Sequence, residues 1–202
     1  MAGRRRHDRV VGMAKVKAEA WREGNALDAL DRTDHEAIVY FSSGGRQYRW
    51  QERLICRISR VITNSTFIHC SIATGGLAMD PTFSRIWLGD EDKYLASHRN
   101  LVAAVLVPMS KEVDLNDHFD GSYRFRWASI PLLLATNGRV SAGPHCTSVV
   151  AGALRSGGVE IPPLICSPAR LYTFLVRKRR CRALLMKNRS FQLVCPPPHR
   201  SC

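Results

Sequence analysis

The alternation of apolar and polar positions predicts where several strands of this chain lie. Residues 101–107 (Leu-Val-Ala-Ala-Val-Leu-Val) are a continuous apolar run, which is typical of a buried strand, and a further strand is expected at residues 36–42 (Glu-Ala-Ile-Val-Tyr-Phe-Ser). Residues 65–74 alternate and are rich in β-branched side chains, and Gly75-Gly76 separates them from the short apolar run 77–80. Two glycines between two strand-like runs predict a hairpin.

Helical spacing marks three other segments. Residues 13–31 carry an apolar stripe among charged residues, and residues 47–62 place their large apolar side chains on one side. A third helix is predicted to begin near Cys146, after a Gly-Pro turn, because small and apolar residues follow without interruption. It should stop at Gly157-Gly158, which is a good signal for the end of a helix. Residues 87–94 look like part of a connection rich in loops.

The predicted position of Cys146 in the first turn of a helix gives it chemical interest. The N-terminus of a helix carries partial positive charge and unpaired N–H groups. Both features should lower the pKa of the thiol and stabilise the thiolate, which is the nucleophilic form. A cysteine in this position can equally be a small buried core residue, so this segment alone leaves both interpretations open.

A second segment offers partners for a thiol nucleophile. His69 lies in the middle of the predicted strand 65–74, and the hairpin should bring Asp80 back beside it. A nucleophilic thiol needs a base within hydrogen-bonding distance, and that base needs an orienting group. A strand histidine and an Asp-Pro turn are the ordinary interpretations. The joint occurrence favours Cys146, His69 and Asp80 as a catalytic set, and His145, whose side chain should point away from its neighbour, ranks below His69.

The order of these residues resembles the permuted NlpC/P60 group of papain-like thiol hydrolases. In that group the His strand precedes the Cys helix, which reverses the order of ordinary papain-like enzymes. The segments that carry the resemblance are Glu36–Ser42, Phe67–Ala73, His145–Gly158 and Ser167–Tyr172. Two positions depart from a simple match: Cys70 stands where the family usually has an apolar residue, and the third catalytic position, here Asp80, varies within the group.

The resemblance implies an α+β protein with a circularly permuted papain-like fold, in which the Cys helix packs on a mainly antiparallel sheet. The matching domain would span residues 32–176, between a basic arm with a docking helix at 1–31 and a basic C-terminal tail at 177–202. The implied activity is that of a cysteine peptidase or amidase on peptide or peptidoglycan bonds, with no cofactor and no metal. A structural assembly protein that retains the fold and a lipid-directed thiol acyltransferase or amidase remain alternatives.

The net charge of +13 indicates which kinds of partner the protein could bind. The charge is concentrated in part at residues 4–6 and 177–182, where arginine and lysine follow one another. Such runs favour an anionic neighbour, which could be nucleic acid, anionic lipid, an acidic glycan or an acidic protein surface, although they can also be solvated tails. No nucleic-acid-binding fold signature accompanies them. We expect the arms to dock the domain onto a larger protein assembly.

The cysteines and the N-terminus bear on localisation. The chain has 7 cysteines, no Cys-x-x-Cys and no paired Cys/His spacing of a structural zinc site, which predicts reduced thiols made in a cytosol. No apolar stretch follows the basic N-terminus as a signal peptide requires, and no apolar run is long enough to span a membrane. If the substrate is cell wall, a bacteriophage particle or lysis system would supply the route to it.

Overall fold

The computed structural model describes only part of the chain. The described residues are 35–43, 53–54, 56–57, 60, 65–98, 100–123, 131–132, 135–136, 143–179, 181–187 and 190–194. The predicted helix at 13–31 and the basic run at 4–6 lie outside them, and so does most of the helix predicted at 47–62.

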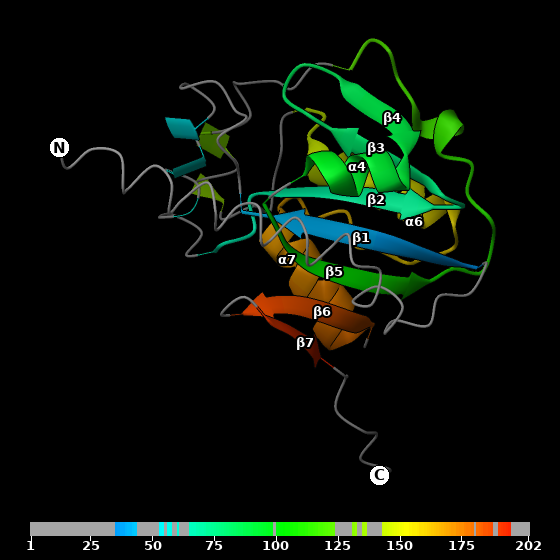
Figure 1. Cartoon of the computed structure of the whole chain (residues 1–202). Coiled ribbons are helices and arrows are strands. Elements are labelled where there is room, and N and C mark those ends of the chain that lie inside the picture. Colours follow the sequence, from blue (N-terminus) through cyan, green and yellow to red (C-terminus); the bar gives the residue numbers. More distant parts are fainter. Residues whose placement is uncertain are drawn as a thin grey trace, which may run out of the picture.

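One antiparallel sheet forms the framework of the described chain (Figure 1). Within the described residues it has seven strands in the order β4-β3-β2-β1-β5-β6-β7, and every neighbouring pair is antiparallel. The strands are β1 (Glu36–Ser42), β2 (His69–Thr74), β3 (Leu77–Pro81), β4 (Ile86–Asp90), β5 (Leu101–Pro108), β6 (Arg182–Lys187) and β7 (Ser190–Val194). The predictions of strands at 36–42 and 101–107 are therefore confirmed.

Helices cover both faces of this sheet, which makes the protein α+β as predicted (Figure 1). The helical elements are α4 (Glu91–Ser97), η1 (Leu115–His118), α6 (Cys146–Ser156), α7 (Pro168–Thr173) and η2 (Phe174–Lys178). On one face, strand residues such as Ile72 and Val105 pack in one core with Val150 and Leu154 of α6. On the other face, alternate strand residues pack against Tyr94 and its neighbour in α4.

The predicted hairpin between β2 and β3 is present. Gly75 and Gly76 both have positive φ, 58° and 79°, and they connect the paired residues Thr74 and Leu77. A two-residue turn with two positive φ values matches the twist of the flanking strands, and glycine adopts it without steric cost. β2 begins at His69, so this histidine lies at the start of the strand and not, as predicted, in its middle.

Two sequence-based predictions differ from the observed elements. The expected loop around residues 87–94 is instead β4 followed by α4, and Asp90 caps the helix by accepting a hydrogen bond from the Lys93 N–H at 3.0 Å. At the C-terminal end, β6 and β7 extend the same sheet. The boundary predicted at residue 177 therefore falls within the sheet-forming chain, and residues 195–202 lie outside the described part.

Candidate active site

The start of α6 places Cys146 in a well-defined position. His145 is the N-cap residue, with an extended backbone, and its N–H donates to Ser148 Oγ at 2.9 Å. The same Ser148 hydroxyl donates to the His145 carbonyl at 2.8 Å. The Nε2 atom of His145 lies 2.6 Å from the Cys166 carbonyl, to which it donates. These contacts fix the first turn, in which Cys146 is half-buried.

The β2–β3 hairpin brings His69 and Asp80 together, as the sequence predicts. The Nε2 atom of His69 contacts Oδ1 of Asp80 in a buried pair. The side chains of His69 and Asp80 are only 10% and 4% exposed. Burying a carboxylate is costly unless it is paired and hydrogen-bonded, so this contact accounts for the presence of Asp80 inside the protein.

Cys146 lies close enough to His69 for the two groups to interact electrostatically. A hydrogen bond with Cys70 is the largest influence that lowers the pKa of Cys146, and burial opposes it. The positive charge of His69, a hydrogen bond with its ring and the charge of His145 lower the pKa further, so it lies well below its ordinary value. The structure thus brings Cys146, His69 and Asp80 together at the end of the sheet where β2 begins.

Cys70 is a neighbour of the nucleophile that the sequence marked only as a departure from a family pattern. Its Sγ lies 3.8 Å from Thr147 Oγ1, and the same hydroxyl lies 4.0 Å from Cys146 Sγ. Burial, followed by the hydrogen bond with Cys146 and its negative charge, raises the pKa of Cys70 well above its ordinary value. Ionisation of the pair is therefore favoured at Cys146, which the charges of His69 and His145 stabilise, over Cys70.

His98 is a second histidine that contacts Asp80, and no pattern in the sequence pairs these two residues. Its Nε2 lies 2.9 Å from Asp80 Oδ2, so each carboxylate oxygen contacts one histidine. Burial opposes ionisation of Asp80, but the charges and hydrogen bonds of His69 and His98 outweigh it and hold the pKa of the carboxyl well below its usual range. His98 follows α4, so recognising it required predicting that helix.

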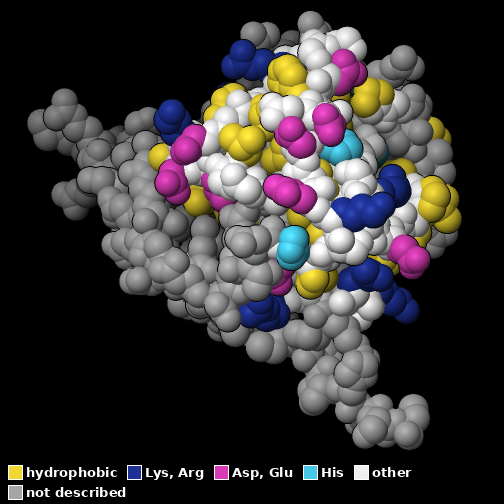
Figure 2. Space-filling view, turned by 90° about the vertical axis from the view of Figure 1, so that its right-hand side faces the viewer, with side chains coloured by type: hydrophobic (Ala, Val, Ile, Leu, Met, Phe, Trp, Pro, Cys, Tyr) yellow, Lys and Arg dark blue, Asp and Glu magenta, His cyan; other side chains and the backbone are white. Residues whose placement is uncertain are grey.

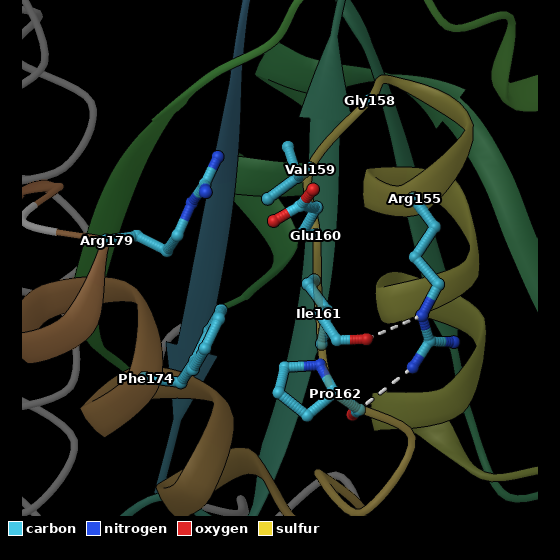
Figure 3. A pocket seen from close by; sticks show the side chains of 8 residues that line it. All are labelled: Arg155, Gly158, Val159, Glu160, Ile161, Pro162, Phe174 and Arg179. Atoms are coloured by element: carbon cyan, nitrogen blue, oxygen red, sulfur yellow. Dashed lines mark hydrogen bonds between the residues drawn. The ribbon is translucent and has the colours of Figure 1, made fainter.

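A surface hollow of about 740 Å³ lies apart from this site (Figure 3). It is bordered by the loop that follows α6 and by Phe174 of η2. Arg155 donates through Nε to the Ile161 carbonyl at 3.0 Å and through Nη2 to the Pro162 carbonyl at 3.4 Å, so it supports this loop. Cys146, His69 and Asp80 do not line the hollow.

The surface of the described residues carries mixed charge on the face shown in Figure 2. Lysine and arginine side chains there are interspersed with aspartate and glutamate, and hydrophobic side chains lie among them. The basic run at 4–6 is outside the described chain, so this view does not test the predicted anionic partners.

The described ranges hold neither a candidate metal cluster nor a candidate membrane span. No group of three or more His, Cys, Asp or Glu side chains there could hold a metal ion. Among the helices of those ranges, none is both long enough and apolar enough to cross a membrane.

Comparison with known proteins adds no relative to this picture. No protein-family model, no curated protein and no solved structure matches the chain.

Proposed function

We propose that this protein is a cysteine hydrolase that cleaves amide bonds, with Cys146 as the nucleophile, His69 as its base and Asp80 as the orienting group. The observation that carries the proposal is the convergence of these three side chains from α6, β2 and β3, with His69 and Cys70 lowering the pKa of the Cys146 thiol. A buried cysteine that served only to fill the core would need neither a histidine nor an ionised carboxylate behind it.

The contacts of His69 define the path of the proton. Its Nε2 atom contacts Asp80, so Nδ1 is the ring nitrogen that accepts the thiol proton of Cys146. The thiolate then attacks the amide carbon, and the C–N bond breaks as Nδ1–H protonates the leaving amine. A water molecule, deprotonated by Nδ1, attacks the resulting thioester, and breakage of the C–S bond returns the Cys146 thiol.

The first turn of α6 supplies donors for the negative charge that develops on the substrate oxygen. The first N–H groups of a helix have no partner within the helix, and Cys146 is the first residue of α6. A carbonyl oxygen that becomes an oxyanion there meets N–H groups and the positive end of the helix dipole.

Cys70 has a supporting part in this proposal. Its single S–H can donate to Thr147 Oγ1 or to Cys146, and it stabilises the thiolate when it donates to Cys146. The Thr147 hydroxyl, within 4.0 Å of both sulfurs, adds a second polar neighbour. A thiol whose pKa is lowered in this way is ionised at neutral pH.

The same proposal includes a fold family and a class of substrate. The order along the chain, with a histidine in β2, an acid in β3 and a cysteine that begins α6, supports a permuted papain-like domain of the NlpC/P60 type. The packing of α6 against an antiparallel sheet agrees with it. The resemblance adds the peptides of peptidoglycan as the first substrates to try.

Hydrolysis of a defined panel tests the proposal. The full chain would be incubated with peptidoglycan stem peptides, acyl dipeptide amides and a phospholipid ester, and the products identified by mass spectrometry. We expect amide cleavage that falls by about 10⁴-fold or more in Cys146→Ala and by about 10²–10⁴-fold in His69→Ala. Cys166→Ala, which removes a thiol whose Sγ donates to the Pro163 carbonyl outside the site, should retain the wild-type rate.

The remaining outcomes separate the alternatives. Cleavage that survives in Cys146→Ala would contradict the assigned nucleophile. Transfer of an acyl group from the phospholipid, with no amide cleavage, would favour the lipid-directed alternative. No product and no acyl adduct on Cys146 with any member of the panel would contradict the enzyme proposal and favour a structural assembly protein.

A further inference from the structure

Both oxygens of the buried Asp80 carboxylate are engaged by histidines. Oδ1 contacts His69, and Oδ2 lies 2.9 Å from Nε2 of His98. A carboxylate held at one oxygen can still rotate about its Cβ–Cγ bond, whereas donors on both oxygens fix its plane. The direction in which Asp80 presents Oδ1 to His69 therefore depends on His98.

His98 is itself held firmly by α4. Its Nδ1 lies 2.9 Å from the Tyr94 carbonyl and 2.9 Å from Ser97 Oγ. The His98 ring stacks on the Tyr94 ring, with centroids 4.0 Å apart and an interplanar angle of 24°. The Tyr94 hydroxyl contacts Ser71 Oγ in β2, the strand that carries His69. The support of His98 is thus tied to the same strand as the proposed base.

The hydrogen bonds around His98 keep its Nε2 protonated in either charge state. In the neutral ring, Nε2–H donates to Asp80, and Nδ1 can accept from the Ser97 hydroxyl once that hydroxyl turns away from the Tyr94 carbonyl, to which it donates at 2.9 Å. In the imidazolium, Nδ1–H donates to the Tyr94 carbonyl and Nε2–H still donates to Asp80. The remaining tautomer would place a bare nitrogen 2.9 Å from an ionised oxygen, where two acceptors repel each other. His98 is therefore a constant donor to Asp80.

Other titratable groups near Asp80 do not duplicate this contact. Glu91 of α4 is occupied by a hydrogen bond from the hydroxyl of a tyrosine in β1 at 2.6 Å. Cys70 and Tyr123, on the α6 side, have raised pKa values, chiefly because burial disfavours their charged forms. Cys146 brings negative charge when ionised. Among the described residues, His69 and His98 thus supply the positive charge and the donors at Asp80.

We propose that His98 is a positioning residue of the site, which holds the Asp80 carboxylate so that Asp80 can orient His69 toward Cys146. This inference rests on the proposed function. His98 acts through Asp80 and makes no contact with the reacting sulfur in the described contacts. A catalytic arrangement needs its groups held to within about 0.5 Å, which requires support behind the groups that react.

The test is the pH dependence of Cys146 alkylation by iodoacetamide in the full chain, followed by mass spectrometry of the Cys146 peptide. In His98→Ala the weakened Asp80–His69 contact stabilises the His69 imidazolium less, so the thiolate forms only at higher pH. We expect the acid midpoint to move up by about one pH unit and the rate at pH 6 to fall about tenfold. His98→Gln should restore most of the wild-type profile, because its amide N–H lies as many bonds from Cβ as His98 Nε2 does.

His118→Ala is the matched control, since this histidine contacts Ser156 Oγ at 2.8 Å, at the far end of α6 from Cys146. Its profile should coincide with that of the wild type. A wild-type midpoint in His98→Ala, or a glutamine variant as shifted as the alanine variant, would overturn the role of His98 and leave the proposed function intact. If His98→Ala does not fold, the test uses the glutamine variant alone. A shifted midpoint in His98→Gln then overturns the positioning role of His98, and an unshifted midpoint supports that role. A wild-type Cys146 with no enhanced reactivity would overturn both.

Discussion

At the scale of single residues, Asp80 is a charge buried inside the protein, and burying a charge is unfavourable. It is an ionised carboxylate, almost fully buried, that two histidines from different elements keep charged. The cost of burying this charge is met only while both partners are in place. The stability of the protein should therefore respond to the protonation of Asp80.

The direction of this response follows from the lowered pKa of Asp80 in the folded protein. A carboxyl group whose pKa is lower folded than unfolded stabilises the fold above the unfolded pKa of about 4 and loses that contribution as pH falls further. Asp80→Asn should therefore lower the free energy of unfolding by on the order of 3 kcal/mol at pH 7. The difference in this free energy between the variant and the wild type should become smaller below about pH 4. Urea unfolding at pH 7, 5 and 3 measures both effects.

Asp117→Asn provides the control for that experiment, because Asp117 is exposed in η1 and its loss should change stability little at any of the three pH values. A cost of Asp80→Asn that stays constant from pH 7 to pH 3 would show that packing, and not charge, accounts for the effect.

At the residue scale, local spacing was enough to bring His69 and Asp80 onto neighbouring strands and Cys146 to the start of α6, while their catalytic role stays a prediction. The hairpin glycines and the Gly-Pro turn carry this placement, although His69 begins β2 and does not lie in its middle. Cys70 and His98 were not assigned any role, because their partners are distant in sequence. The contact of Cys70 with the Cys146 region spans 76 residues, and that of His98 with Asp80 depends on α4.

At the scale of elements, the clearest sequence signals were long apolar runs and glycines. They locate β1, β5, the β2–β3 hairpin and α6, whereas the sequence predicts a loop where the structure has β4 and α4. β4 has only five residues, and three of them are partly exposed, so its alternation is weak. A start signal for α4 was nevertheless present, because Asp90 is followed by two acidic residues in the first turn.

The C-terminal strands were missed for a different reason. The basic run at 177–182 and the prolines at 196–198 suggested a tail, but the apolar segment between them pairs with the sheet. β6 covers the edge of β5, where Ala183 pairs with the fully buried Val105. Charge near a segment indicates little about whether the segment itself joins a core.

This arrangement predicts that a long C-terminal truncation lowers the thermal stability of the protein much more than a short one. Deleting residues 177–202 removes β6, β7 and the end of η2, which leaves the edge of β5 unpaired. We expect the midpoint of thermal unfolding, followed by circular dichroism, to fall by about 10 °C or more. Deleting residues 195–202 alone removes none of the described strand pairs and should change the midpoint by much less. Equal midpoints for the two truncated chains would contradict the structural role of β6 and β7.

At the scale of the whole molecule, the site is assembled from several strands and helices, and no single element contains it. His69 starts β2, Asp80 is near the end of β3, His98 follows α4 on one face and Cys146 begins α6 on the other. The sequence could predict an α+β protein with an antiparallel sheet. It could not predict the strand order, in which β1 lies between β2 and β5, because such pairing joins segments that are far apart in the chain.

Partners of the basic arms remain predictions at this scale. The arm at 1–31 lies outside the described residues, and docking onto a larger assembly or another anionic partner stays untested. The part of the basic run at 177–182 that the structure describes extends from the last two residues of η2 to the first residue of β6. That run therefore belongs to the body of the domain and is not a separate arm.

The most direct test of the central claim is the relative reactivity of the seven cysteines of the full chain toward iodoacetamide at pH 7, measured by site-resolved mass spectrometry. Cys146 should react fastest, by about tenfold or more over the others, because it combines a lowered pKa with a partly exposed position. The advantage should disappear in His69→Ala, which removes the paired base. Uniform labelling, or faster reaction at Cys166 or Cys181, would contradict the assignment of Cys146 as the nucleophile.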